Sequence, residues 1–72
     1  MKNAIGKNIK KIREKMDITQ DQLAIRLQVA GWQVDRFIIS KIERGERQLL
    51  DTEIILIAST LKVSIGNLFE KQ

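Results

Sequence analysis

The chain has 72 residues, of which 43% are hydrophobic and 31% are charged, and its formal net charge is +4. A chain of this length has room for one core only, and its composition is typical of a globular protein rather than a disordered one. Cysteine and histidine are absent, which excludes disulfides, thiolate or imidazole metal sites, Cys nucleophiles and His-based acid/base catalysis.

The balance of charge and the lack of long apolar runs narrow the choice of partner and compartment. Thirteen Lys and Arg residues against nine Asp and Glu residues would attract a polyanion such as nucleic acid; a solvated basic surface is the alternative. No apolar run approaches membrane-spanning length, and residues 1–11 lack the apolar centre of a signal peptide. We therefore expect one domain over residues 1–72, in the cytoplasm, with no membrane partner, metal or cofactor.

Apolar residues at helical spacing and the absence of proline predict an all-α fold. The first helix is expected over residues 4–15, where apolar side chains fall at i, i+4, i+7 and i+11: Ile5, Ile9, Ile12 and Met16. Its other side carries Lys7, Lys10 and Lys11, either as a solvated face or as phosphate contacts. Thr19 followed by Gln22 forms a capping box, which predicts a second helix from about Gln20.

The second helix is expected to bury Leu23, Ala24 and Leu27, which leaves Ile25 exposed without an evident reason. Residues 28–34 then form a connection that is longer than the tightest helix-to-helix turns require. Its Trp32, the only tryptophan, is expected to cover the core; contact with DNA or with a second subunit is the alternative.

The third helix has signals at both of its ends. Asp35 can cap its first turn, Val34 and Ile39 can form a hydrophobic staple, and Gly45 can supply a left-handed stop. Its two faces differ in character. Ile39 and Ile42 face one way, and the other side presents Phe37, Lys41 and Arg44. Such a helix has one anchored face and one cationic, partly aromatic face that is left free.

The rest of the chain predicts two more helices. Asp51 is expected to cap the fourth, whose core stripe is Ile54, Ile57, Ala58 and Leu61. Leu56 lies nearly opposite Ile54 and is a candidate subunit contact. Ser64 can cap a last short helix that runs to Leu68, with Phe69 closing the core.

Taken in order, four segments resemble the λ-repressor/Cro-like helix-turn-helix proteins, also called the Xre family, over residues 5–69. These segments are IGKNIKKIRE, TQDQLAIRL, VDRFIISKIERG and DTEIILIASTLKVSIGNLF. The resemblance implies a compact five-helix λ-repressor-like bundle whose second and third helices bind DNA, with the third in the major groove. Because residues 28–34 exceed the family's shortest turn, the chain resembles a long-turn subgroup.

The resemblance also implies roles for individual residues. Arg36, Phe37 and Lys41 match the base-contacting positions, and Gln20 matches a glutamine that bonds a phosphate and braces the recognition helix. Arg13 and Glu43 match a pair that forms a structural salt bridge. From the helix faces alone, Ser40 joins the outward set that could meet bases, and Arg44 and Arg47 could flank phosphates; dipole compensation and an ordinary solvated loop side chain are the alternatives for these two.

The function expected from these features is sequence-specific binding of double-stranded DNA by a transcriptional regulator, in particular a repressor. Two copies would bind a palindromic site as a homodimer, on half-sites about 34 Å apart. The alternative is a protein-interaction or antitoxin-like adaptor module on the same fold, with Phe37, Ile38, Ile25 and Leu56 as apolar anchors. An enzyme is not expected, because no nucleophile, phosphate-binding glycine loop or metal set accompanies the carboxylates.

Overall fold

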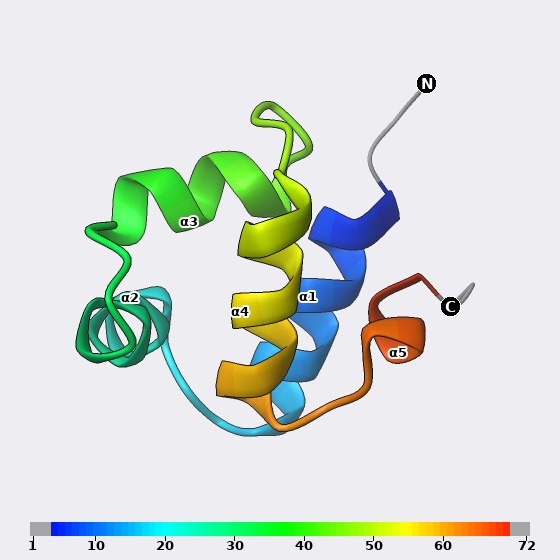
Figure 1. Cartoon of the computed structure of the whole chain (residues 1–72), viewed down its shortest axis with the longest axis horizontal. Coiled ribbons are helices and arrows are strands. Elements are labelled where there is room, and N and C mark those ends of the chain that lie inside the picture. The colour runs from blue at the N-terminus through cyan, green and yellow to red at the C-terminus, as the bar shows by residue number, and fades with distance from the viewer. Residues whose placement is uncertain (1–3, 70–72) are drawn as a thin grey trace.

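A computed structural model describes residues 4–69, which form five α-helices and no strand (Figure 1). The helices are α1 (Ala4–Lys15), α2 (Gln20–Val29), α3 (Arg36–Glu43), α4 (Asp51–Leu61) and α5 (Ile65–Phe69). The expected all-α, five-helix fold is therefore confirmed. Within the described range, none of these helices combines the length and the apolar character that a membrane span requires.

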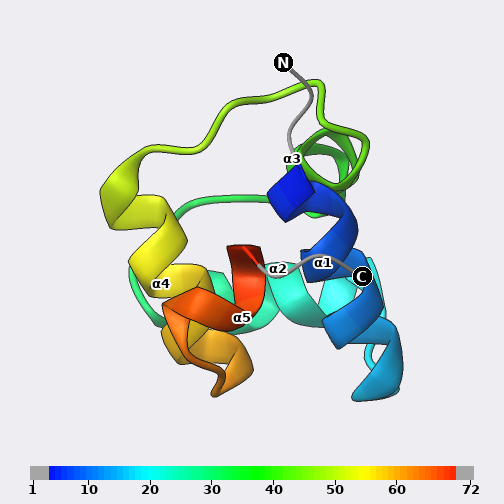
Figure 2. The same cartoon turned by 90° about the vertical axis from the view of Figure 1, so that its right-hand side faces the viewer.

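Helix α3 lies across one end of the bundle, where it packs on α2 and on α1 (Figure 1). Helix α4 packs on α2, and the short α5 packs against both α1 and α4 (Figure 2). The core forms where these elements meet, from apolar side chains that are almost fully buried: Ile9, Leu23, Leu27, Ile39, Ile42, Ile57, Leu61 and Leu68. One long face of α3 therefore remains outside the core.

The helix ends follow from local chemistry. The capping box of α2 is present, with the Gln22 amide donating to Thr19 Oγ1 over 3.0 Å and the Thr19 amide donating to Gln22 Oε1 over 2.8 Å. After α1, α2, α3 and α4 the chain takes a left-handed residue, and the next amide returns to a carbonyl in the last turn. These four residues are Asp17, Gly31, Gly45 and Lys62.

Two expected helix boundaries were wrong. Helix α2 continues through Val29, so the connection to α3 is residues 30–35. It stops there because Gly31 has a φ of 105° and the Trp32 amide donates to the Leu27 carbonyl over 2.9 Å. Asp51 does not cap α4 but is its first residue.

The cap of α4 lacks a side-chain acceptor at the preceding residue, Leu50. The Glu53 carboxylate instead reaches back and accepts a 3.0 Å hydrogen bond from the Leu50 amide. Half of a capping box is therefore enough to begin this helix.

One expected apolar role was also wrong. Phe69 does not close the core, because 56% of its surface is exposed, whereas its neighbour Leu68 is fully buried. The buried Asn8 side chain also donates to the Leu68 carbonyl over 2.7 Å, which ties α5 to α1. Leu56 packs against the core and is half-buried, so the exposed apolar side chain on this part of α4 is Ile55.

Helix α1 approaches α3 closely at Gly6. A Cβ at this position would lie 2.2 Å from the Ile42 carbonyl oxygen, which is a backbone atom held in a helix. We expect Gly6→Ala to lower the free energy of unfolding by about 2 kcal/mol or more, because the two helices would have to separate. Denaturant unfolding followed by circular dichroism measures the change.

The matched control is Gly66→Ala in α5. A Cβ there would lie 3.7 Å from Ser64 Oγ, which is ordinary contact. We expect this second variant to unfold within about 1 kcal/mol of the parent, with a helix-propensity gain as the main effect. Equal stability of the two variants would contradict the close approach of α1 and α3.

Candidate nucleic-acid interface

Helix α3 has a capping residue before its first turn and a row of buried side chains on its inner face. The Asp35 carboxylate accepts a 3.0 Å hydrogen bond from the Ile38 amide, and Ile39, Ile42 and Glu43 are buried. The outward side presents exposed side chains: Arg36, Phe37, Lys41 and Arg44. Ser40 lies between the two faces and is half-buried. The helix therefore carries its cationic and aromatic groups on the side away from the core.

A buried ion pair attaches the inner face of α3 to α1. Arg13 Nε lies 2.7 Å from Glu43 Oε2, and Arg13 Nη2 donates to Glu43 Oε1 over 3.1 Å. The third nitrogen of Arg13 donates to the Ile18 carbonyl over 2.8 Å. The hydrogen bonds to Glu43 raise the pKa of Arg13 above its usual value, so the Arg13 guanidinium is charged near neutral pH.

Gln20 completes this attachment from α2. Its side-chain amide donates to Glu43 Oε1 over 3.0 Å, so one carboxylate is held by α1 and α2 together. Gln20 therefore braces α3 from within the protein. Its amide carries a second hydrogen, which is chemically able to donate to a phosphate.

Arg36 stands at the first turn of α3 between two neighbours. Its guanidinium lies 3.8 Å from an Asp21 carboxylate oxygen and 5.1 Å from the centre of the Phe37 ring. More than half of the Arg36 and Asp21 side chains is exposed, so the ion pair contributes less than about 1 kcal/mol. The position of Arg36 is thus only weakly restrained, and its guanidinium can exchange Asp21 for another acceptor.

Arg44, at the other end of α3, is paired in the same way. It donates to both carboxylate oxygens of Glu46 over 2.9 and 3.1 Å, and also to the Ser40 hydroxyl. The bond from Arg44 lowers the pKa of Glu46, with a smaller contribution from nearby Lys41. Lys41 itself makes no ion pair with any residue of the described range, which leaves its ammonium the most available cation of this face.

Arg47 differs from Arg36 and Arg44 because its ion pair is better shielded from water, with 33% of its side chain and 13% of the Glu53 side chain exposed. Its two terminal nitrogens donate to the two oxygens of Glu53 over 3.1 and 3.2 Å, and its guanidinium lies 5.6 Å from the centre of the Trp32 ring. The bond from Arg47 lowers the pKa of the Glu53 carboxyl. Trp32 packs against the core, as expected, and its ring is also a partner for Arg47.

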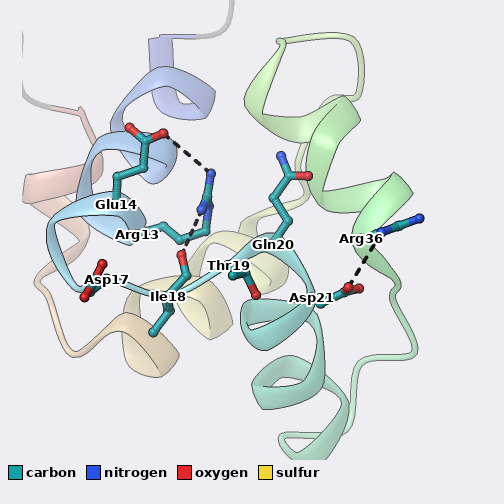
Figure 3. Close-up of a pocket in the computed structure, with 8 residues that line it drawn as sticks. All are labelled: Arg13, Glu14, Asp17, Ile18, Thr19, Gln20, Asp21 and Arg36. Carbon is teal, nitrogen blue, oxygen red and sulfur yellow. Dashed lines mark hydrogen bonds and ion pairs between the residues drawn. The ribbon is translucent and has the colours of Figure 1, made fainter.

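An open hollow of about 610 Å³ lies where the end of α1, the start of α2 and the start of α3 meet (Figure 3). Arg36 projects from α3 at one side of it, next to Asp21 (Figure 3). Three carboxylates line the hollow, those of Glu14, Asp17 and Asp21. These carboxylates disfavour an anion inside the hollow.

Comparison with known proteins decides the family. A model of the helix-turn-helix family matches residues 9–68, which is most of the chain. The chain belongs to that family. The resemblance to Xre/Cro-like DNA-binding regulators is thereby confirmed, and α2 and α3 are its helix-turn-helix.

Solved structures with a similar fold exist, and one of them is a controller protein. The crystal structure of the restriction-modification controller protein C.AhdI from Aeromonas hydrophila superimposes with a TM-score of 0.80 at 24% sequence identity, over 93% of this chain and 90% of that one. A likeness at this identity concerns the fold. No curated protein matches.

Several groups near the face of α3 were not anticipated from the sequence. Asp21 and Glu46 partner the two outward arginines, and Glu53 holds Arg47. The separation of Arg44 from Glu46 is two residues, so that pair was accessible to sequence inspection. The other two pairs depend on how α2, α3 and α4 pack, for which the sequence carries no local signal.

The buried pair of Arg13 and Glu43 generates a stability prediction. Glu43→Ala should lower the free energy of unfolding by about 3 to 5 kcal/mol, because the Arg13 guanidinium would stay buried without its partner. Asp21→Ala removes the exposed partner of Arg36 and should cost less than about 1 kcal/mol. Chemical denaturation of the two variants measures the contrast, and similar losses would show that the pair between α1 and α3 is not special.

The pair of Arg47 and Glu53 generates a pH prediction. The folded pKa of Glu53 lies below its usual value of 4.5, so its contribution is full above that pH and is lost as the pH falls through the folded value. At pH 7 the parent should be more stable than Glu53→Gln by about 1 to 2 kcal/mol. Thermal unfolding over a series of pH values from 7 downward should show this difference shrink as the pH falls through the folded pKa of Glu53; a difference that stays constant over the whole series would exclude the ionised pair as its cause.

Proposed function

We propose that the protein binds double-stranded DNA sequence-specifically as a transcriptional regulator, in particular a repressor. The observation that supports this most is the outward face of α3 in a helix-turn-helix protein, with Arg36 and Phe37 in its first turn and Lys41 one turn on. A helix fits the major groove, about 12 Å wide, and contacts base edges with the residues near its N-terminus. C.AhdI, which shares the fold, is a restriction-modification controller protein, and this is consistent with a regulatory role.

The chemistry of the four proposed base contacts gives each of them a different role. Arg36 can donate two hydrogen bonds to a guanine edge, and Phe37, which is 63% exposed, can contact a thymine methyl. Lys41 and Ser40 can meet either a base or a sugar-phosphate group. Gln20 and Arg44 lie beside this set and are the proposed phosphate contacts.

The carboxylates of Asp21 and Glu46 give this face a particular property. Each holds an arginine that is proposed to meet DNA, so binding exchanges an internal ion pair for a contact with DNA. A guanine edge or a well-placed phosphate compensates for the lost ion pair better than a non-specific contact with DNA does. The two acids therefore favour discrimination over affinity.

We further propose that the protein acts as a homodimer on a palindromic site, since one domain of this size makes few contacts. A groove of about 300 Å³ is the candidate surface for the second copy, and four apolar side chains line it: Ile54, Ile55, Ile65 and Phe69. They belong to α4 and α5, so a copy seated there leaves α3 free. This surface replaces the contact expected at Leu56.

Selection of bound sequences from a randomised duplex pool tests the proposed function directly. We expect an enriched inverted repeat whose affinity falls steeply as the salt concentration rises, because phosphate contacts release counterions. An absence of retained DNA at low salt would refute the function and favour an adaptor module. Of the four apolar anchors proposed for such a module, Phe37 and Ile25 are exposed, but Ile38 and Leu56 pack against the core.

The proposed base contacts are tested by Arg36→Ala and Phe37→Ala. Both side chains are exposed, so the fold should survive, while preference for the selected site over a scrambled duplex should fall by about 10-fold or more for each. Repeating the selection with each variant would show which base pair loses its preference. Equal losses of affinity on both duplexes would indicate phosphate contact instead.

A further inference from the structure

Arg47 lies in the connection that follows α3. This connection, residues 44–50, runs from the end of α3 across to the start of α4 (Figure 2). Most of the Arg47 side chain is covered, with about a third exposed, and the Glu53 side chain is 13% exposed. The pair is therefore far better shielded from water than the pairs of Arg36 and Arg44.

The geometry of Arg47 is that of a fixed group. Its terminal nitrogens bond the two oxygens of Glu53, one each, and its guanidinium carbon lies over the Trp32 ring, 5.6 Å from the ring centre. Bidentate pairing through a planar fork is a property of arginine that lysine does not reproduce. Glu53 is fixed in turn, because it also accepts from the Leu50 amide.

The partners of Arg47 come from both sides of α3 in the chain. Trp32 lies in the turn that leads into α3 and is tied to the last turn of α2 through its amide bond to the Leu27 carbonyl. Glu53 lies in the first turn of α4. One guanidinium thus joins the segment before α3 to the segment after it.

We propose that Arg47 is a positioning residue that clamps Trp32 to Glu53 and so fixes the orientation of α3. This inference rests on the proposed function, in which α3 enters the major groove. It assigns to Arg47 and Trp32 a role that needs no contact with DNA. It replaces the expectation that Arg47 binds a phosphate.

Glu53→Gln distinguishes the clamp from a phosphate contact by the sign of its effect. If Arg47 bound a phosphate, this change would free its guanidinium and remove a negative charge, so affinity for DNA would rise. If Arg47 is a clamp, the change loosens it, and affinity for the selected site falls although the protein has become more positive. We expect a fall of about 5-fold or more.

Arg47→Lys and Arg47→Gln complete the set. Lysine keeps the charge that a phosphate needs but loses the paired bonds and the planar group, so the clamp predicts that both variants weaken binding alike. Removal of a clamp should also leave the dependence of log affinity on log salt unchanged, whereas loss of a phosphate contact reduces its slope by about one. Lys62→Asn is the control for loss of one positive charge, because Lys62 is exposed and has the left-handed backbone that asparagine accepts.

The experiment is a fluorescence anisotropy titration of the selected duplex over a series of salt concentrations, at a temperature where thermal unfolding shows every variant to be folded. The expected result is weaker binding by Glu53→Gln, Arg47→Lys and Arg47→Gln, with the parental salt slope and no further loss in the double variant Arg47→Gln/Glu53→Gln. Tighter binding by Glu53→Gln, parental binding by Arg47→Lys, or a reduced slope in Arg47→Gln would each overturn the proposal.

Quenching of the single tryptophan by acrylamide gives a readout that does not depend on DNA. With the clamp intact the Trp32 indole is covered by Arg47, so Arg47→Gln and Glu53→Gln should both increase quenching, and Lys62→Asn should not. If the parent binds no duplex, the proposed function fails by itself. In that case the quenching of Trp32 alone tests the clamp, and unchanged quenching in both Arg47→Gln and Glu53→Gln would overturn it.

Discussion

The buried ion pair of Arg13 and Glu43 is the constraint on which the placement of α3 depends. Two charges taken out of water are tolerable only when each is paired and its remaining hydrogen-bonding groups are satisfied. Here the carboxylate accepts from Arg13 and Gln20, and the last nitrogen of Arg13 finds the Ile18 carbonyl. A rotation of α3 about its axis would break the bonds of Glu43 to Arg13 and to Gln20 together, so its inward face is defined more sharply than apolar packing alone would define it.

The same contact region explains the free face of the helix. Gly6 lets the backbone of α1 approach the Ile42 carbonyl, and the ion pair fixes the rotation, so the residues about half a turn away must face outward. Two of the outward cations, Arg36 and Arg44, are held by neighbouring carboxylates. These two carboxylates therefore offset part of the positive charge that Arg36, Lys41 and Arg44 bring to this face.

Features with a local cause were predictable from the sequence. The apolar stripe of α2, its capping box and the stop at Gly45 were predicted because each depends on residues within a turn or two of one another. The prediction for Phe69, at the end of helix α5, was wrong because five helical positions are too few for the apolar period to assign a residue to one side. The pairs of Arg36 with Asp21 and of Arg47 with Trp32 could not be predicted, since tertiary packing creates them.

The length of the turn before α3 connects these observations. A very short turn fixes the angle between two helices because the chain has no slack, whereas residues 30–35 could in principle allow several angles. Contacts supply what shortness does not: Gln28 Nε2 donates to the Val34 carbonyl over 2.6 Å, Asp35 caps α3, and Trp32 packs on the core. Arg47 extends this restraint across α3 to Glu53. A long turn is therefore compatible with a precisely oriented helix when side-chain contacts restrain the angle between the two helices.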